Sequence, residues 1–289
     1  MKLKTPFPSY AQYNEDIILL ALLHDVENGF YVDVGANYPV IDSVTKLFYQ
    51  HGWRGINIEP IPGLCNQLKD DRPEDVNLNI GIGEKNSKIT FYENINIPGH
   101  SSFKRPDNKG AEIKEYEVPI KTLKDIFKKN RVKRIHFLKV DVEGFEDEVI
   151  SSNDWNKYRP EVLCIESGIK GSKYRAVIKS ANYKLFIQDG VNEYYLATES
   201  YYRTKGFEDR VVRLVDNSLR YHQYRSWLGS SRQLKKVTKL NRIHYEEMIR
   251  LRNENTLSLK NMGYGTRLKR AIYGLTTDWF SYKRNSRKK

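Results

Sequence analysis

Acidic side chains follow four short apolar runs of this sequence, each of the kind that forms a buried strand. They are Asp33 after "FYV", Glu59 after "GINI", Asp141 and Glu143 after "FLKV", and Glu166 after "VLCI". In an open α/β sheet, ligands bind outside the carboxyl ends of the strands. One acid in such a place is often only a solvated strand end, but several along one edge predict a ligand-binding cleft.

Glu59 indicates what this cleft binds. A carboxylate that closes the second strand of such a sheet has two acceptor oxygens, which can face the two hydroxyls of a ribose. The simpler alternative is an acid at the N-terminus of the helix that follows. We favour the first interpretation, which predicts a nucleoside-bearing cofactor.

The turn "DVGAN" after the first run narrows the choice of cofactor. A dinucleotide fold needs the pattern G-x-G-x-x-G, so that the backbone and a helix N-terminus can approach a pyrophosphate. Here Gly35 stands alone and is followed by Ala36 and Asn37. The turn therefore fits a cofactor without a phosphate, such as S-adenosylmethionine, better than a nicotinamide dinucleotide.

Strand-like runs alternate with helix-like segments over the first 200 residues. Strands are expected at 30–34, 54–60, 76–83, 88–94, 114–120, 134–144 and 161–167, and a hairpin at 184–197. Helices are expected within 9–25 and at 44–53, 64–73, 122–130, 145–152 and 173–183. This alternation predicts an α/β fold with a mostly parallel sheet, helices on both of its faces and an antiparallel hairpin at its edge.

The net charge of +13 is distributed unevenly along the chain. Residues 201–289 hold 22 Lys and Arg against 7 Asp and Glu, whereas residues 1–200 are close to neutral. The asymmetry predicts a near-neutral domain over 1–200 and a basic, mainly helical extension over 201–289. Two amphipathic segments of the extension, 232–252 and 266–280, suit an anionic membrane surface or an anionic glycan, and equally suit packing on the first domain.

Cysteine use and hydropathy indicate the compartment. Cys65 and Cys164 form no CxxC pair, and we expect both to be reduced. The start of the sequence lacks the apolar segment of a secretion signal, and the apolar run 17–23 is too short to cross a bilayer. We therefore expect a cytoplasmic protein, with peripheral attachment to the inner face of a membrane as an option for the extension.

Several segments closely resemble the FkbM methyltransferase family. They are "YNEDIIL", "GFYVDVGANYP", "FYQHGWRGINIEPIP", "IHFLKVDVEGFEDEVI" and "RPEVLCIE", which follow in this order between residues 9 and 197. The resemblance implies a class I, Rossmann-like, S-adenosylmethionine-dependent fold with a seven-stranded sheet whose last strand is antiparallel. It also implies methyl transfer to an oxygen, with carbohydrates, polyketides or other small metabolites as acceptors.

The resemblance also assigns roles to residues of this sequence. It implies that Asp33, Gly35 and Asn37 line the methionine end of the cofactor. It implies that Glu59 holds the ribose and that Asp141 lies beside the transferred methyl group.

Methyl transfer to a hydroxyl needs a general base, because the acceptor loses its proton as the new bond forms. The candidates are Asp141, Glu143, Glu166 and His100, which lies in the turn-rich stretch "NIPGHSSF". A metal is the competing mechanism, in which Asp141 and Glu166 hold Mg²⁺ and lower the pKa of the acceptor. Two carboxylates are too few to assign such a site, so no metal ligands are predicted.

Two other functions compete with an O-methyltransferase acting on a glycan or other small metabolite, including surface-polysaccharide modification. The basic extension would suit a nucleic-acid methyltransferase of the same fold, although its charges lie outside the catalytic segments and no RNA-reading motif is present. A non-catalytic binding module with a vestigial cleft would keep the fold without the reaction. Methylation assays with RNA and with sugars distinguish a nucleic-acid methyltransferase from an enzyme that acts on glycans or small metabolites. Failure to bind S-adenosylmethionine would favour the non-catalytic module.

Overall fold

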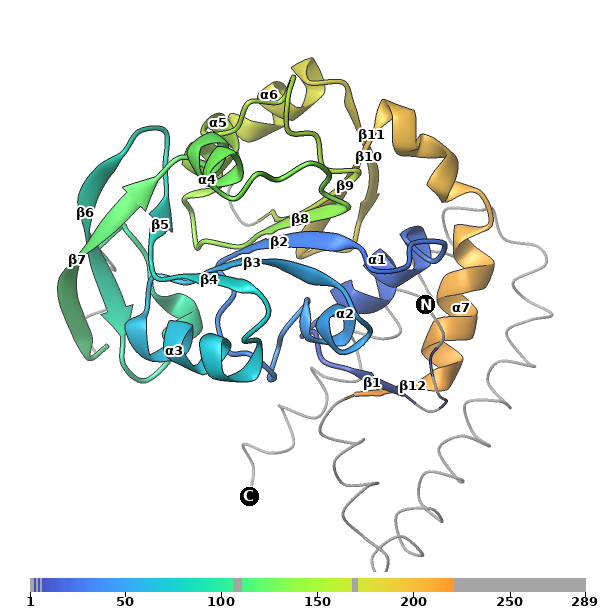
Figure 1. Ribbon diagram of the computed structural model, residues 1–289, viewed down its shortest axis with the longest axis horizontal. Helices are drawn as coiled ribbons and strands as arrows, with labels where there is room; N and C mark the ends of the chain where they lie inside the picture. The colour runs from blue at the N-terminus through green and yellow to red at the C-terminus, as the bar shows by residue number, and fades with distance from the viewer. Residues whose placement is uncertain (1–2, 4, 6, 106–110, 168–170, 221–289) are drawn as a thin grey trace, which may run out of the picture. The chain divides into compact units, whose positions relative to one another are not determined.

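The larger unit of the protein, Tyr10–Phe207, is built on a seven-stranded sheet with the strand order β10-β11-β9-β8-β2-β3-β4 (Figure 1). The structure is a computed structural model that describes all residues except 1–2, 4, 6, 106–110, 168–170 and 221–289. The strands are β2 (Phe30–Val34), β3 (Arg54–Ile58), β4 (Val76–Leu78), β8 (Phe137–Val140), β9 (Val162–Glu166), β10 (Tyr183–Gln188) and β11 (Asn192–Ala197).

The strand directions confirm the predicted fold class. Strands β4, β3, β2, β8 and β9 are parallel, and β11 is antiparallel to both of its neighbours, β9 and β10. β11, the last strand of this sheet in chain order, is therefore the antiparallel one. It lies between β9 and β10, and β10 forms the edge of the sheet. All four residues of β8 are buried, as expected for a parallel strand covered on both faces.

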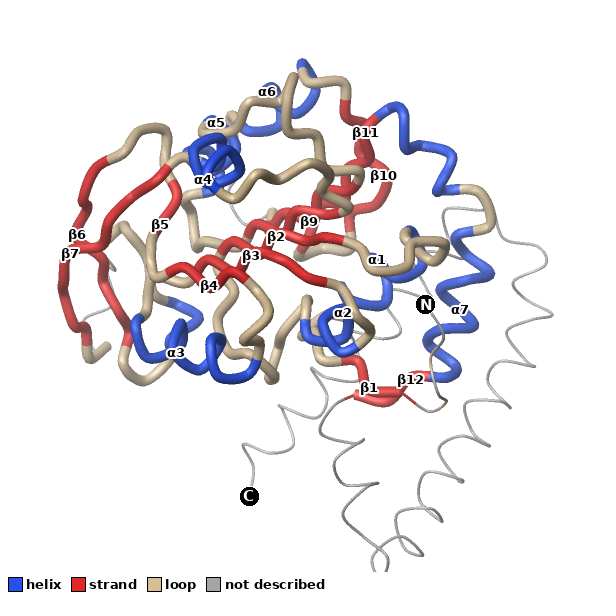
Figure 2. The backbone as a smooth tube through the Cα atoms, viewed as in Figure 1, coloured by secondary structure: helices blue, strands red, loops and turns tan. Residues whose placement is uncertain are grey.

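Helices cover both faces of this sheet (Figure 2). One face carries α1 (Glu15–Leu22), α2 (Lys46–Gln50) and α3 (Pro62–Asp71). The other carries α4 (Leu123–Lys129), α5 (Glu146–Ser151) and α6 (Tyr174–Ser180). A core cluster that includes Val32, Ile56 and Leu138 joins these layers. Cys65 and Cys164 are both buried and free.

A second, three-stranded sheet has the order β5-β7-β6 and consists of β5 (Gly81–Ile82), β6 (Ser87–Asn94) and β7 (Ile113–Lys121). The expected strands at 88–94 and 114–120 are present as β6 and β7, which pair antiparallel, and a 3-10 turn, η1 (Pro98–His100), lies in their connection. The single strand predicted over 76–83 is wrong, because the chain leaves the first sheet after β4 and enters the second at β5.

Side-chain contacts explain this break. The amide of Asn79 donates to the carbonyls of Glu59 and Pro60, both at 2.9 Å, which turns the chain away from β3. Gly81 then packs so closely on Phe103 that a Cβ would lie 2.4 Å from its ring.

The seven-stranded sheet, its helices and the three-stranded sheet belong to one compact unit, Tyr10–Phe207, which also holds the 3-10 segment η2 (Thr198–Thr204). The described part of the second unit contains the parallel pair β1 (Phe7–Ser9) and β12 (Ser218–Arg220), and α7 (Phe207–Asn217), which starts at the boundary. No helix among the described residues is both long and apolar enough to span a membrane. The amphipathic segments predicted at 232–252 and 266–280 lie outside the described residues.

Candidate active site

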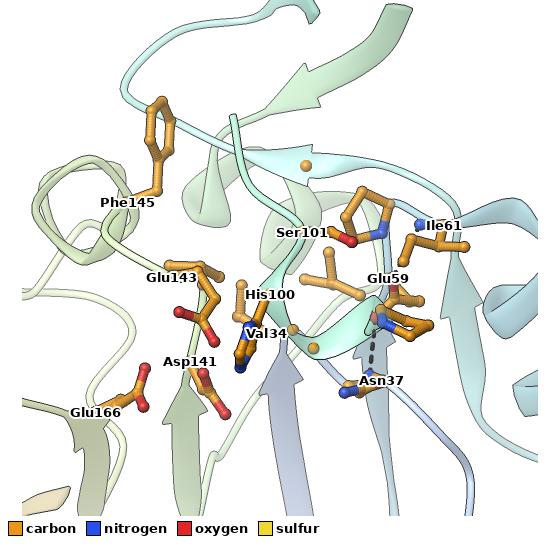
Figure 3. Close-up of a pocket in the computed structure, with 18 of the residues that line it drawn as sticks. Val34, Asn37, Glu59, Ile61, His100, Ser101, Asp141, Glu143, Phe145 and Glu166 are labelled. Carbon is orange, nitrogen blue, oxygen red and sulfur yellow. Dashed lines mark hydrogen bonds between the residues drawn. The ribbon is translucent and has the colours of Figure 1, made fainter. Parts of the chain in front are cut away.

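A pocket of about 490 Å³ opens at the carboxyl ends of β2, β3, β8 and β9 (Figure 3). Its size is typical of a site for a small molecule or cofactor. All of the site residues predicted from the sequence line it, with the exception of Asp33. They are Gly35, Asn37, Glu59, His100, Asp141, Glu143 and Glu166.

The turn after β2 is built around Gly35. Its φ of +79° lies in the left-handed region, and a Cβ on it would come within 1.8 Å of the carbonyl oxygen of Asp141. The N–H groups of Gly35 and Ala36 both donate to the carbonyl of Ile58, at 3.0 and 3.1 Å. Only glycine allows the end of β2 to lie this close to the end of β8.

Glu59 lines one side of the pocket and is buried. Its Oε2 accepts the N–H of Asn37 and its Oε1 accepts the N–H of Ile61, both at 2.8 Å (Figure 3). Burial raises the pKa of this carboxyl to about 7, although the two backbone hydrogen bonds oppose the shift. Each oxygen keeps acceptor capacity beyond its backbone bond, so the group can still receive two hydroxyls.

Asn37 contributes an acceptor that the described part of the chain leaves unused. Its backbone has a φ of 52°, and its Oδ1 is buried without a hydrogen-bond partner among the described residues. Gly99 of η1 faces the same side chain, since a Cβ there would lie 3.3 Å from Nδ2 of Asn37. A buried acceptor without a partner in a pocket is suited to a donor on a ligand.

Asp33 lies outside the pocket lining and is 1% exposed. Its Oδ2 accepts the hydroxyl of Thr45 at 2.8 Å, and its Oδ1 lies 3.5 Å from Nζ of Lys139. In the structure, Asp33 therefore supports the turn through Thr45 and Lys139 instead of contacting the cavity.

Lys139 links the two sides of the site. Its Nζ donates to the carbonyl of Gly35 at 2.7 Å and lies 3.2 Å from Oδ2 of Asp141. Burial alone would lower the pKa of Lys139, but Asp141 and Asp33 outweigh burial and hold this pKa well above its usual value. The ammonium group is therefore charged and neutralises much of the negative charge of Asp141.

Asp141, Glu143 and Glu166 form an acidic cluster on the other side of the pocket. One carboxylate oxygen from each lies within 4.8 Å of the others. Partial loss of solvent, followed by repulsion from Asp141, raises the pKa of Glu143 to about 7 and that of Glu166 to about 9, although Glu143 itself is exposed and Glu166 half-buried. The cluster has the oxygen ligands that a divalent cation would take, and it also has carboxyl groups whose pKa values suit proton transfer.

His100 lies between these two sides (Figure 3). It is the last residue of η1, which brings it from the three-stranded sheet across the opening of the pocket. The structure thus joins residues from both sheets in a single cavity.

Polar lining residues that were not predicted from the sequence include Gln12, Tyr13 and Asp42. Burial and then the charge of Glu15 raise the pKa of Tyr13, and Glu166 and Asp141 add to the shift. Tyr13 is the first residue of the segment "YNEDIIL", which was the available signal.

Comparison with solved structures gives weak likenesses to methyltransferases. A TehB-like S-adenosylmethionine-dependent methyltransferase from Corynebacterium glutamicum is 10% identical, with a TM-score of 0.33, over 63% of this chain and 85% of that one. The METTL16 methyltransferase domain is 14% identical, with a TM-score of 0.38, over 68% and 70%. The tRNA methyltransferase TrmK of B. subtilis is 12% identical, with a TM-score of 0.33, over 93% and 95%. Likenesses at this level carry no argument about substrate.

The comparison of sequences is more decisive. Among curated proteins, no match was found. The family model of the methyltransferase FkbM domain matches residues 33–185, which is more than half of the chain and contains every predicted site residue. Together with the confirmed sheet topology, this match shows that the chain belongs to the FkbM family of S-adenosylmethionine-dependent methyltransferases.

Proposed function

We propose that the protein transfers the methyl group of S-adenosylmethionine to a hydroxyl of a carbohydrate or another small metabolite. Family membership supports S-adenosylmethionine-dependent methyl transfer in general. The observation that supports a hydroxyl acceptor is that one pocket holds both the buried carboxylate of Glu59, directly after β3, and the acidic cluster at the carboxyl ends of β8 and β9.

The residues on the Glu59 side fit the cofactor. Glu59 has acceptor capacity for the two ribose hydroxyls, and the buried Oδ1 of Asn37 can receive the amino group of the methionine part. Gly35 has no side chain to cover the backbone of the turn, so a ligand can approach this backbone closely. When bound, the cofactor supplies a methyl group on a positively charged sulfur, which the neighbouring carboxylates stabilise.

The charges of the acidic cluster narrow the choice of general base. Asp141 is neutralised by Lys139, and Glu166 holds a proton at neutral pH because its pKa is raised to about 9. Glu143, with its pKa near neutrality, and His100 are left as groups that can accept a proton. When the acceptor hydroxyl takes up the methyl group from the bound cofactor, one of these two residues would accept the hydroxyl proton.

The charge of the pocket also indicates the class of acceptor. Of the described lining residues, five are Asp or Glu and Lys139 is the single Lys or Arg. A phosphate-bearing acceptor would meet this acidic lining with repulsion, whereas a neutral polyhydroxy compound could accept and donate hydrogen bonds. The pocket therefore favours a neutral metabolite over a nucleic acid.

We also propose that the basic extension, 201–289, brings the enzyme to an anionic glycan or to an anionic membrane surface. The support is its excess of 22 Lys and Arg over 7 Asp and Glu. Co-sedimentation with vesicles of neutral and of anionic lipid, in low and high salt, tests this. Binding that is independent of lipid charge would contradict it.

The test of the main proposal is an incubation with methyl-labelled S-adenosylmethionine and three acceptor pools, namely surface-polysaccharide precursors, neutral sugars and total RNA. We expect the label in the first or second pool, on an oxygen that mass spectrometry and NMR identify. Label in RNA would favour a nucleic-acid methyltransferase. Absence of S-adenosylmethionine binding by calorimetry would favour a non-catalytic module.

A further inference from the structure

Three consecutive residues, Ser102–Lys104, contact the turn that carries Glu143. The hydroxyl of Ser102 donates to the carbonyl of Glu143 at 3.0 Å, and the ammonium group of Lys104 donates to the carbonyl of Gly144. Two successive peptide groups of one turn are therefore held by the same short segment. We call this set of contacts the clasp.

Aromatic packing completes the clasp. The ring of Phe103 lies 5.2 Å from that of Phe145 and 4.8 Å from that of Phe91 on β6, measured between centroids. Gly81 packs against the same Phe103 ring. The clasp thus joins the three-stranded sheet to the end of β8 through packing as well as hydrogen bonds.

The turn at Glu143 has a backbone that needs such support. Glu143 has a φ of 51° and Gly144 a φ of 93°, so both are in the left-handed region. For a residue with a Cβ, this conformation costs about 1–2 kcal/mol. The N–H of Gly144 donates to the Glu146 side chain at 3.0 Å, but the two carbonyls depend on Ser102 and Lys104. This backbone directs the Glu143 carboxylate to Asp141 and Glu166.

The same segment also fixes His100. The backbone of Ser102 pairs with that of Tyr92 on β6, with hydrogen bonds of 2.9 and 3.2 Å. The hydroxyl of Ser101 accepts the N–H of Asn94 at 2.9 Å, which closes the base of the loop that carries η1. His100 therefore stands two residues from the anchor that holds Glu143.

We infer that Ser102 is a positioning residue for methyl transfer, which sets Glu143 and His100 relative to each other by holding both from one anchored segment. This inference rests on the proposed function, because it concerns the two residues suited to accept the proton. Ser102 does not line the pocket and touches no reacting atom.

The experiment compares four variants of the full chain. Ser102→Ala removes the hydroxyl, Ser102→Thr keeps it, and Lys104→Met removes the second donor at an exposed position where failure to fold is not expected. Thr90→Ala, on β6 of the same sheet and outside the pocket lining, is the matched control. The readouts are amide hydrogen exchange, S-adenosylmethionine affinity by calorimetry, and turnover with the acceptor that the labelling experiment identifies.

In Ser102→Ala we expect exchange in 97–101 and 143–145 to accelerate about tenfold or more. Turnover should fall about 10–100-fold through kcat, because a misplacement of about 1 Å is enough for such a loss. S-adenosylmethionine affinity should stay within about twofold, since Glu59 and Gly35 are not part of the clasp. Lys104→Met should show a smaller change of the same kind, and Ser102→Thr and Thr90→Ala should behave as the native protein.

Unchanged exchange at 143–145 in Ser102→Ala would overturn the inference. So would a loss of activity in Ser102→Thr equal to that in Ser102→Ala, or a loss of cofactor affinity as large as the loss of turnover. The exchange measurement needs no acceptor. It therefore tests whether Ser102 holds the turn of Glu143 even if the native protein methylates none of the three acceptor pools. That second result would count against the proposed function and not against the role of Ser102.

Discussion

Gly35 and Asp141 touch through their backbones, so that a Cβ on Gly35 would lie 1.8 Å from the carbonyl oxygen of Asp141. Lys139 reinforces this contact, because its Nζ binds the carbonyl of Gly35 and the carboxylate of Asp141. The turn that fits the cofactor and the acid that would lie beside the transferred methyl group therefore form one rigid junction.

Gly35→Ala should destabilise the protein by about 3 kcal/mol or more, because the added methyl group meets backbone atoms at a positive φ. The free energy of unfolding, measured by urea denaturation, should fall, and cofactor affinity should fall with it. Gly63→Ala is the matched control. Gly63 lies in the first turn of α3 with nothing within 4 Å of a built Cβ, so alanine should stabilise the helix by about 0.5–1 kcal/mol. Equal stability of the two variants would contradict the close approach.

Glu59→Gln should weaken S-adenosylmethionine binding about 10–100-fold, and Glu59→Ala at least as much. The amide nitrogen of Gln cannot accept a hydrogen bond, so either Asn37 N–H or Ile61 N–H loses its acceptor and the ribose loses one too. Calorimetry measures the affinity, and a cooperative urea transition shows that the fold is intact. Glu84→Gln, an exposed acid outside the lining, is the control. Unchanged affinity in the Glu59 variants would remove Glu59 from the cofactor site.

The stability of the ligand-free protein should fall as the pH rises from about 5 to about 9. Burial raises the pKa values of Glu59, Glu143 and Glu166 above 4.5, so the folded protein binds more protons than the unfolded chain across this window. Glu166→Gln, which imitates the protonated carboxyl, should make this decline shallower by about 1–2 kcal/mol after allowance for solvent screening. Urea unfolding at several pH values measures the slope.

Glu199→Gln is the control for that experiment. Its hydrogen bond with Arg159 lowers the pKa of Glu199, so the contribution of Glu199 to stability is lost at acid pH and not at alkaline pH. The alkaline decline should therefore be the same as in the native protein. A decline that Glu166→Gln leaves unchanged would show that Glu166 is ionised in the folded state.

Methyl transfer should continue after divalent cations are removed with EDTA. A cation at the acidic cluster would meet the ammonium group of Lys139, which lies 3.2 Å from Oδ2 of Asp141 and would repel the cation. Turnover before and after chelation, with Mg²⁺ added back, measures this. Loss of activity that Mg²⁺ restores would establish the metal mechanism instead.

Much of the site could be predicted because it lies at strand ends. In a parallel sheet the carboxyl ends meet at one edge, so Glu59, Asp141 and Glu166 were placed together by the positions of their strands alone. Asp33 likewise lies near the carboxyl end of its strand, but its side chain points to Thr45 and Lys139. Whether the side chain at a strand end points into the pocket depends on the side chains that pack around it. The sequence pattern of a single strand does not contain that information.

The sequence by itself determined the order of strands and helices, the family, and the acids at the strand ends, because these depend on hydrophobic periodicity and on short local motifs. Only the tertiary structure decided that Lys139 neutralises Asp141, that the stretch 76–83 divides between two sheets, and that Ser102 holds the turn of Glu143. Each of these depends on contacts between residues distant in the chain: even Lys139, which is close to Asp141 in sequence, is held in place by the carbonyl of Gly35. Such contacts depend on how the two sheets pack against each other, which is a property of the whole fold.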